Sequence, residues 1–316
     1  MTSEPEAARL IANAAQALSD GGLVAFPTET VYGLGADATN GRAVASIYKA
    51  KGRPRFNPLI AHVAETEQAL ALGRFDTRSQ KLARAFWPGP LTLVVPASEN
   101  CPVHDLARAG LPTVALRVPS HPVARALLTE FGGPVVAPSA NRSGHVSPTR
   151  AGHVADDLGE FVRVILDGGP TQIGVESTVI LCLPDEPVRM LRPGGLSRRD
   201  IEEVLGERLA DKPDEVLAPG MLAQHYAPDA RVRLKAEDAE EGEAWLGFGP
   251  EAGLGGHGVA HLNLSPSGDL AEAAANLFAY LRELDALSPS AIAVAAIPMT
   301  GLGEAINDRL ARAALR

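Results

Sequence analysis

The sequence is poor in cysteine, in long apolar runs and in positive charge, and each shortage argues against a class of protein. The two cysteines, Cys101 and Cys182, lie far apart without metal-type spacing, and two free thiols fit a reducing cytosol. No apolar run approaches membrane-spanning length, and residues 1–22 lack the basic and apolar regions of a signal peptide. We therefore expect a cytoplasmic protein without a membrane partner.

Positive charge is the third shortage. Lys and Arg number 29 against 38 Asp and Glu, which gives a formal net charge of −9. A protein that holds nucleic acid tightly through its phosphates usually carries a basic face. The balance argues against tight direct binding of RNA and favours a small-molecule site with locally concentrated cations. A basic stripe hidden in the fold stays open as an alternative.

The length of 316 residues and a hydrophobic content of 46% predict two domains with substantial cores. The apolar and β-branched pattern of residues 1–209 predicts a mixed α/β domain. Residues 210–229 are rich in proline and read as a linker. Residues 230–316 predict a small α/β domain of their own, and their seven basic and twelve acidic side chains from Arg231 onward make it a poor RNA-binding module.

Short apolar segments separated by amphipathic stretches give the expected elements. In the larger domain, strands are expected at 23–27, 59–63, 91–95, 113–118, 135–137, 163–166, 177–183 and 188–191. Helices are expected there at 4–20, 41–51, 79–86, 123–131 and 197–205. In the smaller domain, strands at 232–234, 245–248, 259–264 and 292–297 alternate with helices at 270–287 and 304–315.

The segment YKAKGRPRFNPL concentrates cations in an acidic protein. Lys49, Lys51, Arg53 and Arg55 place four positive charges within seven residues. Cations at a solvated helix end would explain them without any function. However, glycine and proline break the helix at this point, so alternate charges can project from a loop into one site. The segment is therefore a candidate anion site.

Two further segments carry groups suited to phosphate. VVAPSANRSGHVSPT places small hydroxyls, an amide and glycine directly after an apolar strand, as phosphate cradles do, although an ordinary polar loop has the same composition. FPTETVYGLGADATN follows another strand, and Gly33 and Gly35 predict tight turning there. It matches neither a P-loop nor a dinucleotide-binding fingerprint.

Taken together, seven segments in order resemble the YrdC-type threonylcarbamoyl-AMP synthases, in their long two-domain form. These segments are FPTETVYGLG, IYKAKGRPRFNPL with AHV, WPGPLTLV, VALRVP, APSANRSG, GGPTQIGVESTV and MLRPGG. The resemblance implies a YrdC-like twisted mixed sheet with helices around a concave basic cleft, plus a small Rossmann-like C-terminal α/β domain. It also implies condensation of L-threonine, bicarbonate and ATP into threonylcarbamoyl-AMP and pyrophosphate, for tRNA modification by a threonylcarbamoyl transferase complex.

The resemblance also implies roles for individual residues. The catalytic group is Lys51, Arg53, Ser139 and Asn141. The threonine-binding group is Thr30, His62, Arg117, Ala137 and Ser177, in which Arg117 suits a bidentate pair with the carboxylate. The ATP-binding group is Arg53, Asn57, Thr113, Ser139, Ser147, Arg192 and Tyr226. Without the resemblance, His62 would read as an ordinary buried strand histidine.

The segment HYAP, with His225 and Tyr226, resembles the interdomain loop that folds over the active site in this family. Gln224 stands where many relatives carry a basic residue, which removes one expected cation from this loop. Magnesium is expected with ATP, held through phosphate oxygens and water, with no protein ligand assigned and Glu29 as the one candidate to test.

Three rival interpretations remain at this point. A non-catalytic nucleotide- or RNA-binding relative would keep the fold, but the acidic balance and intact signatures weigh against it. Carbamoyl transfer in hydrogenase maturation requires zinc-finger-type cysteine pairs that two cysteines cannot supply. A C-terminal domain that only docks partners is the third.

Overall fold

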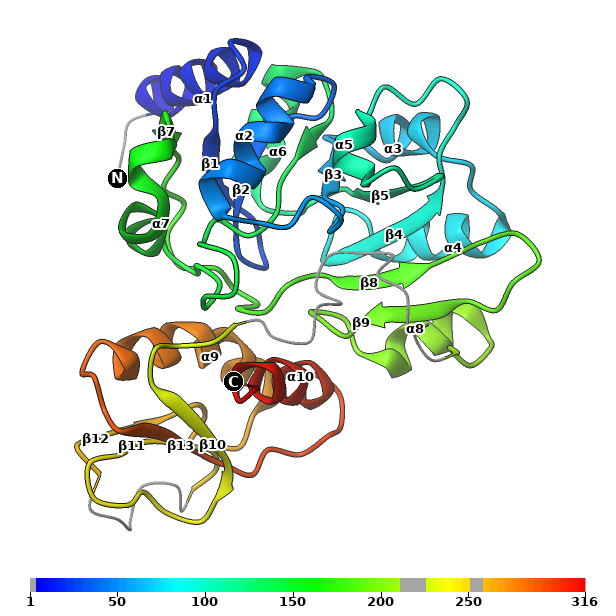
Figure 1. Cartoon of the computed structure of the whole chain (residues 1–316). Helices are drawn as coiled ribbons and strands as arrows, with labels where there is room; N and C mark the ends of the chain where they lie inside the picture. Colours follow the sequence, from blue (N-terminus) through cyan, green and yellow to red (C-terminus); the bar gives the residue numbers. More distant parts are fainter. Residues whose placement is uncertain (1–3, 211–225, 251–257, 316) are drawn as a thin grey trace.

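A nine-stranded mixed sheet forms the larger part of the molecule (Figure 1). In this computed structural model, the described residues are 4–210, 226–250 and 258–315. The strands, in sequence order, are β1 (Val24–Pro27), β2 (Tyr32–Asp37), β3 (Ile60–His62), β4 (Leu91–Pro96), β5 (Thr113–Arg117), β6 (Val135–Val136), β7 (Val164–Ile165), β8 (Thr178–Leu181) and β9 (Arg189–Arg192). Their order across the sheet is β7-β1-β2-β6-β3-β5-β4-β8-β9. Three of the eight strand pairs are parallel and five are antiparallel, so the expected mixed sheet is confirmed.

Helices pack against this sheet and carry the end signals that the sequence contains. They are α1 (Glu4–Ser19), α2 (Gly41–Lys51), α3 (Thr66–Leu72), α4 (Thr77–Phe86), α5 (Asp105–Arg108), α6 (Pro122–Phe131), α7 (Ala151–Leu158) with the short η1 (Gly159–Phe161), and α8 (Arg198–Leu205). The side chain of Asn40 caps the start of α2, and Gly52 ends it in the left-handed conformation with φ of 62°. The break at Gly52 therefore turns the chain out of the helix just before Arg53.

The strand β2 corrects one expectation. Gly33 and Gly35 lie inside this strand and do not form a tight turn. A Cβ on Gly35 would lie 2.8 Å from a ring atom of Phe26 and 3.0 Å from a methyl of Val135, and one on Gly33 would lie 3.1 Å from the Cβ of Ala137. Close packing between neighbouring strands, and not a turn, requires these glycines.

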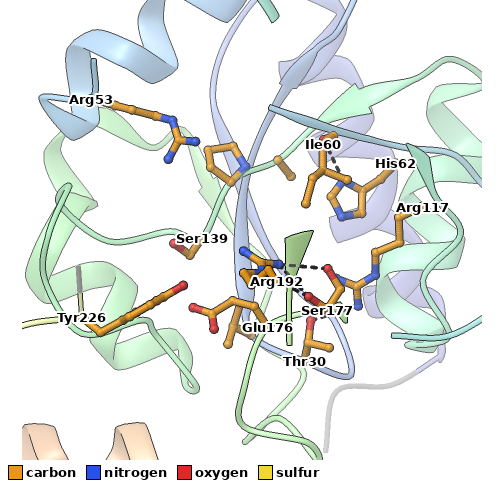
Figure 2. Close-up of a pocket in the computed structure, with 13 residues that line it drawn as sticks. Thr30, Arg53, Ile60, His62, Arg117, Ser139, Glu176, Ser177, Arg192 and Tyr226 are labelled. Atoms are coloured by element: carbon orange, nitrogen blue, oxygen red, sulfur yellow. Dashed lines mark hydrogen bonds between the residues drawn. The ribbon is translucent and has the colours of Figure 1, made fainter. Parts of the chain in front are cut away.

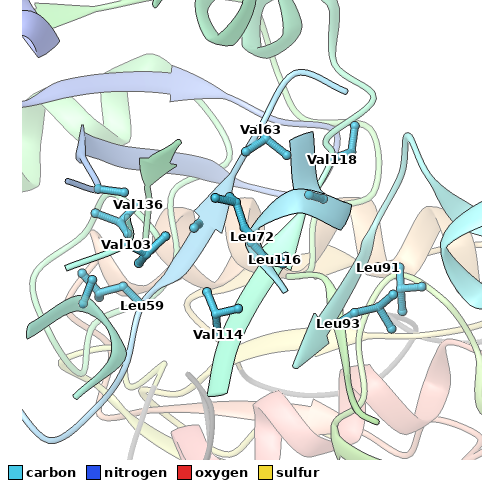
Figure 3. Packing of buried hydrophobic residues seen from close by; sticks show 14 of the residues in the cluster. Leu59, Val63, Leu72, Leu91, Leu93, Val103, Val114, Leu116, Val118 and Val136 are labelled. Atoms are coloured by element: carbon cyan, nitrogen blue, oxygen red, sulfur yellow. The ribbon is translucent and has the colours of Figure 1, made fainter. Parts of the chain in front are cut away.

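The two faces of the sheet have different tasks, which follow from the alternation of side chains along each strand. One face packs the main core, in which Val114 and Leu116 of β5 lie beside Leu91 and Leu93 of β4 (Figure 3). The other face carries a smaller apolar cluster that includes Ile60 and Ala115. Because side chains two residues apart share a face, His62 and Arg117 belong to this second face.

Residues beyond the expected linker form a second, four-stranded sheet. Its strands β10 (Arg231–Ala236), β11 (Ala244–Gly247), β12 (Ala260–Asn263) and β13 (Ala291–Ala295) are all parallel, in the order β10-β13-β11-β12. The helices α9 (Leu270–Asp285) and α10 (Gly303–Ala313) lie between this sheet and the larger domain (Figure 1). The parallel α/β arrangement agrees with the Rossmann-like prediction.

Of the expected linker and lid, residues 210–229, the part from 211 to 225, which includes Gln224 and His225, lies outside the described residues. Tyr226 is the first described residue after them. The apolar cluster of the second domain extends across the domain boundary, because it includes Val31, Val146 and Val175 of the larger domain together with α9 and α10 side chains. In the described ranges, no helix has both the length and the apolar character needed to cross a membrane.

Candidate active site

One pocket gathers side chains from the ends of several strands of the large sheet (Figure 2). It is lined by Thr30, Val31, Arg53, Ile60, His62, Arg117, Ala137, Pro138, Ser139, Glu176, Ser177, Arg192 and Tyr226. Nine of these were predicted from the sequence as site residues. They come from segments that are up to 196 residues apart, between Thr30 and Tyr226, so the fold brings together what the motifs only suggested.

The register of two parallel strands places the first pair of polar side chains. β3 and β5 run parallel, and His62 lies directly opposite Arg117 at the last paired position of each strand. In α/β sheets, ligands bind in the crevice outside the carboxyl ends of parallel strands. The pocket is therefore located where strand topology favours a site.

Arg117 is held in a buried network on one side. Its Nη2 donates to Oε1 of Glu29 at 2.6 Å and to Oγ1 of Thr30 at 2.9 Å. The other oxygen of Glu29 accepts from the backbone N–H of Ser120 at 3.0 Å. Burial raises the pKa of the Glu29 carboxyl, but the charge and hydrogen bonds of Arg117 outweigh it and hold the net pKa below its usual range. Glu29 is thus ionised, and its ion pair orients Arg117.

His62 stays neutral in this environment. Burial, assisted by the charge of Arg117, lowers the pKa of His62 to about 3. Its Nδ1 lies 3.1 Å from the carbonyl oxygen of Ile60, and its ring meets Phe26 edge-on. A neutral imidazole here can donate or accept a hydrogen bond without adding a charge.

Arg192 and Arg53 are anchored in the same manner as Arg117. Arg192 donates through Nε and Nη2 to the carbonyl oxygen of Ser177, at 3.2 and 2.8 Å, and through Nη2 to the Ser177 hydroxyl. Arg53 donates through Nε to the carbonyl of Asn57 and through Nη2 to that of Pro58. Burial lowers the pKa of Arg53 to about 10, so its guanidinium remains cationic at neutral pH.

The three arginines share one further property. In each, Nε and Nη2 are bonded to the protein, whereas Nη1 has no hydrogen-bond acceptor within the described part of the chain. All three side chains are buried and line the pocket. A buried guanidinium with a free donor is well suited to bind a carboxylate or a phosphate, because the anion completes its hydrogen bonding.

Ser139 is held in the pocket wall by main-chain hydrogen bonds to β2. The N–H of Leu34 donates to the carbonyl of Pro138 and the N–H of Ala140 donates to that of Tyr32, both at 2.8 Å. The extended segment around Ser139 therefore continues the sheet, which fixes the backbone of Ser139 at the pocket.

Two predicted catalytic residues, Lys51 and Asn141, lie behind this wall instead of on it. Nζ of Lys51 donates to the carbonyl oxygens of Ser139, at 2.6 Å, and of Asn141. The amide of Asn141 donates to the carbonyls of Arg142 and His145, both at 2.8 Å. Burial, with repulsion from Arg53, lowers the pKa of Lys51 well below its usual value. The contacts of both side chains brace the loop that carries Ser139.

The remaining predicted ATP contacts are placed differently from one another. Asn57 is buried beside Arg53, and its Oδ1 has no partner among the described residues. Ser147 lies one layer behind the pocket, where it donates to Glu176 at 2.5 Å. Thr113 begins β5 and is about 13 Å along that strand from Arg117, from four residues at roughly 3.3 Å each. The described fold thus does not place Thr113 in this pocket.

Glu176 is the charged lining residue that sequence reasoning missed. Its Oε1 accepts from Ser147 and its Oε2 accepts from Arg309 of α10 at 2.8 Å. Burial raises the pKa of Glu176, but Arg309 and Arg192 outweigh that effect and bring it to about 2. The segment GVESTV contained the only signal, a carboxylate next to Ser177; its partner lies 133 residues away.

Comparisons with known proteins identify the family of the chain. Two family models match the chain: one described as telomere recombination, of the Sua5, YciO and YrdC type, over residues 16–194, and one described as the C-terminal domain of threonylcarbamoyl-AMP synthase over residues 196–315. The threonylcarbamoyl-AMP synthase of Bacillus subtilis is 42% identical, over 99% of this chain and 94% of that protein. That of Pyrococcus abyssi is 44% identical, over 95% of this chain and 92% of that protein.

A solved structure gives the same result at the level of the fold. The crystal structure of P. abyssi Sua5 complexed with L-threonine matches with a TM-score of 0.86 and 40% identity. The match covers 96% of this chain and 94% of the other. Both domains are therefore shared, and not the larger one alone. The chain belongs to the two-domain Sua5 family of threonylcarbamoyl-AMP synthases.

Proposed function

We propose that this chain condenses L-threonine, bicarbonate and ATP into threonylcarbamoyl-AMP and pyrophosphate in the pocket of Figure 2. The observation that carries the proposal is the set of three buried guanidinium groups, each with one unused donor. All the substrates bring negative charge to the pocket: a carboxylate, a bicarbonate and a triphosphate. A site that concentrates buried cations in a protein of net charge −9 meets that demand.

The threonine end of the pocket is formed by Arg117, Thr30 and His62. Nη1 of Arg117 is available to the threonine carboxylate, while Glu29 fixes the opposite edge of the guanidinium. Neutral His62 opposite Arg117 offers a hydrogen bond to the substrate, and Ala137 and Ser177 complete this part of the wall. The solved P. abyssi relative was crystallised with L-threonine, which supports this assignment.

The nucleotide end contains Arg53, Arg192, Ser139 and Tyr226. The threonine amine loses a proton and gains carbon dioxide from bicarbonate with release of water, which gives a carbamate. A carbamate oxygen then forms a bond to the α-phosphorus in line with the bond to the β-phosphate, which breaks as pyrophosphate leaves. Fixed guanidinium and hydroxyl donors stabilise the charge that develops on the phosphoryl oxygens.

Lys51 and Asn141 act in this scheme by holding the Ser139 loop. Their polar atoms are occupied by main-chain partners, so we assign them positioning roles. Asn57 is placed to approach the nucleotide beside Arg53, and Ser147 to orient Glu176. Thr113 carries no role in this scheme.

Magnesium enters as part of the ATP substrate, held through phosphate oxygens and water. Among residues 4–210, 226–250 and 258–315, no group of three or more His, Cys, Asp or Glu could hold a metal ion. Both oxygens of Glu29 are engaged by Arg117 and Ser120, which makes it a poor ligand. We place the reaction in the cytoplasm, where a transferase complex would use the product on tRNA.

The test is formation of the product itself. Incubation with ATP, bicarbonate and L-threonine should release pyrophosphate and yield a species with the mass of threonylcarbamoyl-AMP. Omission of either threonine or bicarbonate is the control, because each supplies part of the product. Pyrophosphate release that does not depend on threonine would contradict the proposal.

A further inference from the structure

Arg309 of α10, in the C-terminal domain, contacts a residue of the pocket wall. This guanidinium is fully buried, and its Nε donates to Oε2 of Glu176 at 2.8 Å. Its Nη1 donates to Asp308 at 2.6 Å. Glu176 lines the pocket and belongs to the larger domain, so this ion pair joins the two domains at the wall of the site.

The same arginine also holds Tyr226. The guanidinium carbon of Arg309 lies 5.1 Å from the centre of the Tyr226 ring, and Phe278 of α9 stacks on that ring with centroids 5.6 Å apart. Tyr226 is buried and lines the pocket, and its backbone adopts a φ of 65°. A non-glycine residue keeps such a conformation where surrounding contacts determine it, and Arg309 and Phe278 of the second domain are among those contacts.

The interface around these contacts is closely packed. Gly174, two residues before Glu176, approaches α9 so nearly that a Cβ on it would lie 2.3 Å from the carbonyl oxygen of Ala274. Arg282 of α9 donates to Asp157 of α7 at 2.7 Å. Beside this interface, the Glu176 carboxylate is held by Ser147 of the larger domain and by Arg309 of the smaller one.

The charge balance at Glu176 gives Arg309 a specific task. Arg192 lines the same pocket as Glu176 (Figure 2), and its positive charge also favours the ionised carboxylate. The Glu176 carboxylate also interacts electrostatically with Lys51, but Lys51 is hydrogen-bonded to the Ser139 loop. If Arg309 were absent, Glu176 would attract Arg192, whose Nη1 is otherwise free for a ligand.

We propose that the C-terminal domain is a part of the active site, in which Arg309 is a positioning residue that neutralises Glu176 and fixes Tyr226, and so keeps Arg192 available to ATP. This inference rests on the proposed function, because it assigns Arg192 and Tyr226 to the nucleotide end. The inference differs from the interpretation that this domain only docks partners, because it states that ATP binding itself requires α10.

The test compares three variants for their KM values and for calorimetric binding of a non-hydrolysable ATP analogue. Arg309→Met should raise the KM for ATP about tenfold or more and that for threonine less than threefold. The double variant Arg309→Met with Glu176→Gln should recover an ATP KM within about fivefold of wild type, because no carboxylate then attracts Arg192. Glu304→Gln is the matched control: it breaks another interdomain ion pair, with Arg198 at 2.8 Å, away from the pocket, and should change either KM less than twofold.

Two results would overturn the inference. One is an Arg309→Met enzyme that binds ATP as well as the Glu304→Gln control. The other is a double variant that is folded but keeps a raised KM for ATP. This second result tests the inference even if Arg309→Met alone does not fold. Failure of the proposed function would be a different result, because the wild-type enzyme would then form no product. Calorimetry would still compare the affinities of the variants for the ATP analogue.

Discussion

The front and the back of the pocket wall both contain buried cations, yet they use their donors differently. Arg53, Arg117 and Arg192 on the front each keep Nη1 without an acceptor among the described residues, while Nε and Nη2 are anchored. Lys51 at the back is bonded to two carbonyl oxygens of the Ser139 loop. The comparison teaches that, within this wall, a cation that lines the pocket and keeps an unused donor is a candidate ligand contact, whereas Lys51 holds the scaffold.

The largest effect is expected for Arg117→Ala. It removes the partner of the threonine carboxylate and leaves Glu29 buried without its cation, and loss of one member of such a pair costs about 3–5 kcal/mol. We expect a fall in kcat/KM for threonine of roughly 10²–10³-fold, since charge-assisted pairs are worth about 2–5 kcal/mol. Steady-state kinetics with threonine varied measures it.

The control for this variant is Arg125→Ala. Arg125 pairs with Glu65 at the surface, and exposed pairs contribute only about 0–1 kcal/mol. Kinetics close to wild type are expected there. If Arg117→Ala bound threonine as tightly as Arg125→Ala, the front of the wall would not be the anion site.

The next prediction separates the front from the back directly. Arg53→Met should raise the KM for ATP, because its free donor serves the ligand, and should also lower stability, because the buried carbonyls of Asn57 and Pro58 lose their donor. Lys51→Met should lower stability by about 2–6 kcal/mol without a selective change in the KM for ATP, because it leaves two buried carbonyl groups unsatisfied at roughly 1–3 kcal/mol each. Parallel measurement of melting curves and ATP kinetics checks both.

The opposite pattern would break the comparison. An Arg53→Met enzyme that is destabilised without a change in ATP KM would make Arg53 part of the scaffold. A Lys51→Met enzyme of normal stability with a raised KM for ATP would make Lys51 a ligand-binding residue.

A smaller effect is expected from pH through His62. Its folded pKa of about 3 lies below the unfolded value of about 6.5, so only the unfolded chain binds the proton between these values. The contribution of His62 to stability is therefore full above pH 6.5 and is lost as the pH falls toward 3, by about 2 kcal/mol at pH 5. His62→Gln should lose less stability than wild type between pH 7 and 5, as measured by melting temperature. An equal loss would mean that His62 is protonated when folded.

The smallest effects are expected at the two exposed cations of the same basic segment. Lys49 and Arg55 point outward, whereas Lys51 and Arg53 are buried. Alanine at either exposed position should change kinetics less than twofold, because exposed side chains away from contacts contribute little. A tenfold loss at Arg55 would extend the anion site beyond the pocket.

Local patterns in the sequence predicted much of this structure. The features that they missed depend on contacts between residues that are far apart along the chain. The helix of residues 41–51 was predicted with its true bounds, because its cap and its terminating glycine are neighbours in sequence. The strand β2 was missed, because its glycines are required by packing, of Gly35 against Phe26 and Val135 and of Gly33 against Ala137, which no local signal reveals.

The site divides in the same manner. Motifs identified the arginines that line the pocket, but could not tell that Lys51 and Asn141 turn toward main-chain carbonyls, because that depends on how the Ser139 loop folds over them. Glu176 and Arg309 were not identified at all. Their ion pair joins two domains, and each residue alone reads as an ordinary charge.

The most direct measurement is a crystal structure with L-threonine and a non-hydrolysable ATP analogue. Anionic oxygens of the ligands should lie about 3 Å from Nη1 of Arg53, Arg117 and Arg192, with Nζ of Lys51 still on the carbonyls of Ser139 and Asn141. Ligands held by Lys51, with the three Nη1 atoms unoccupied, would contradict the account.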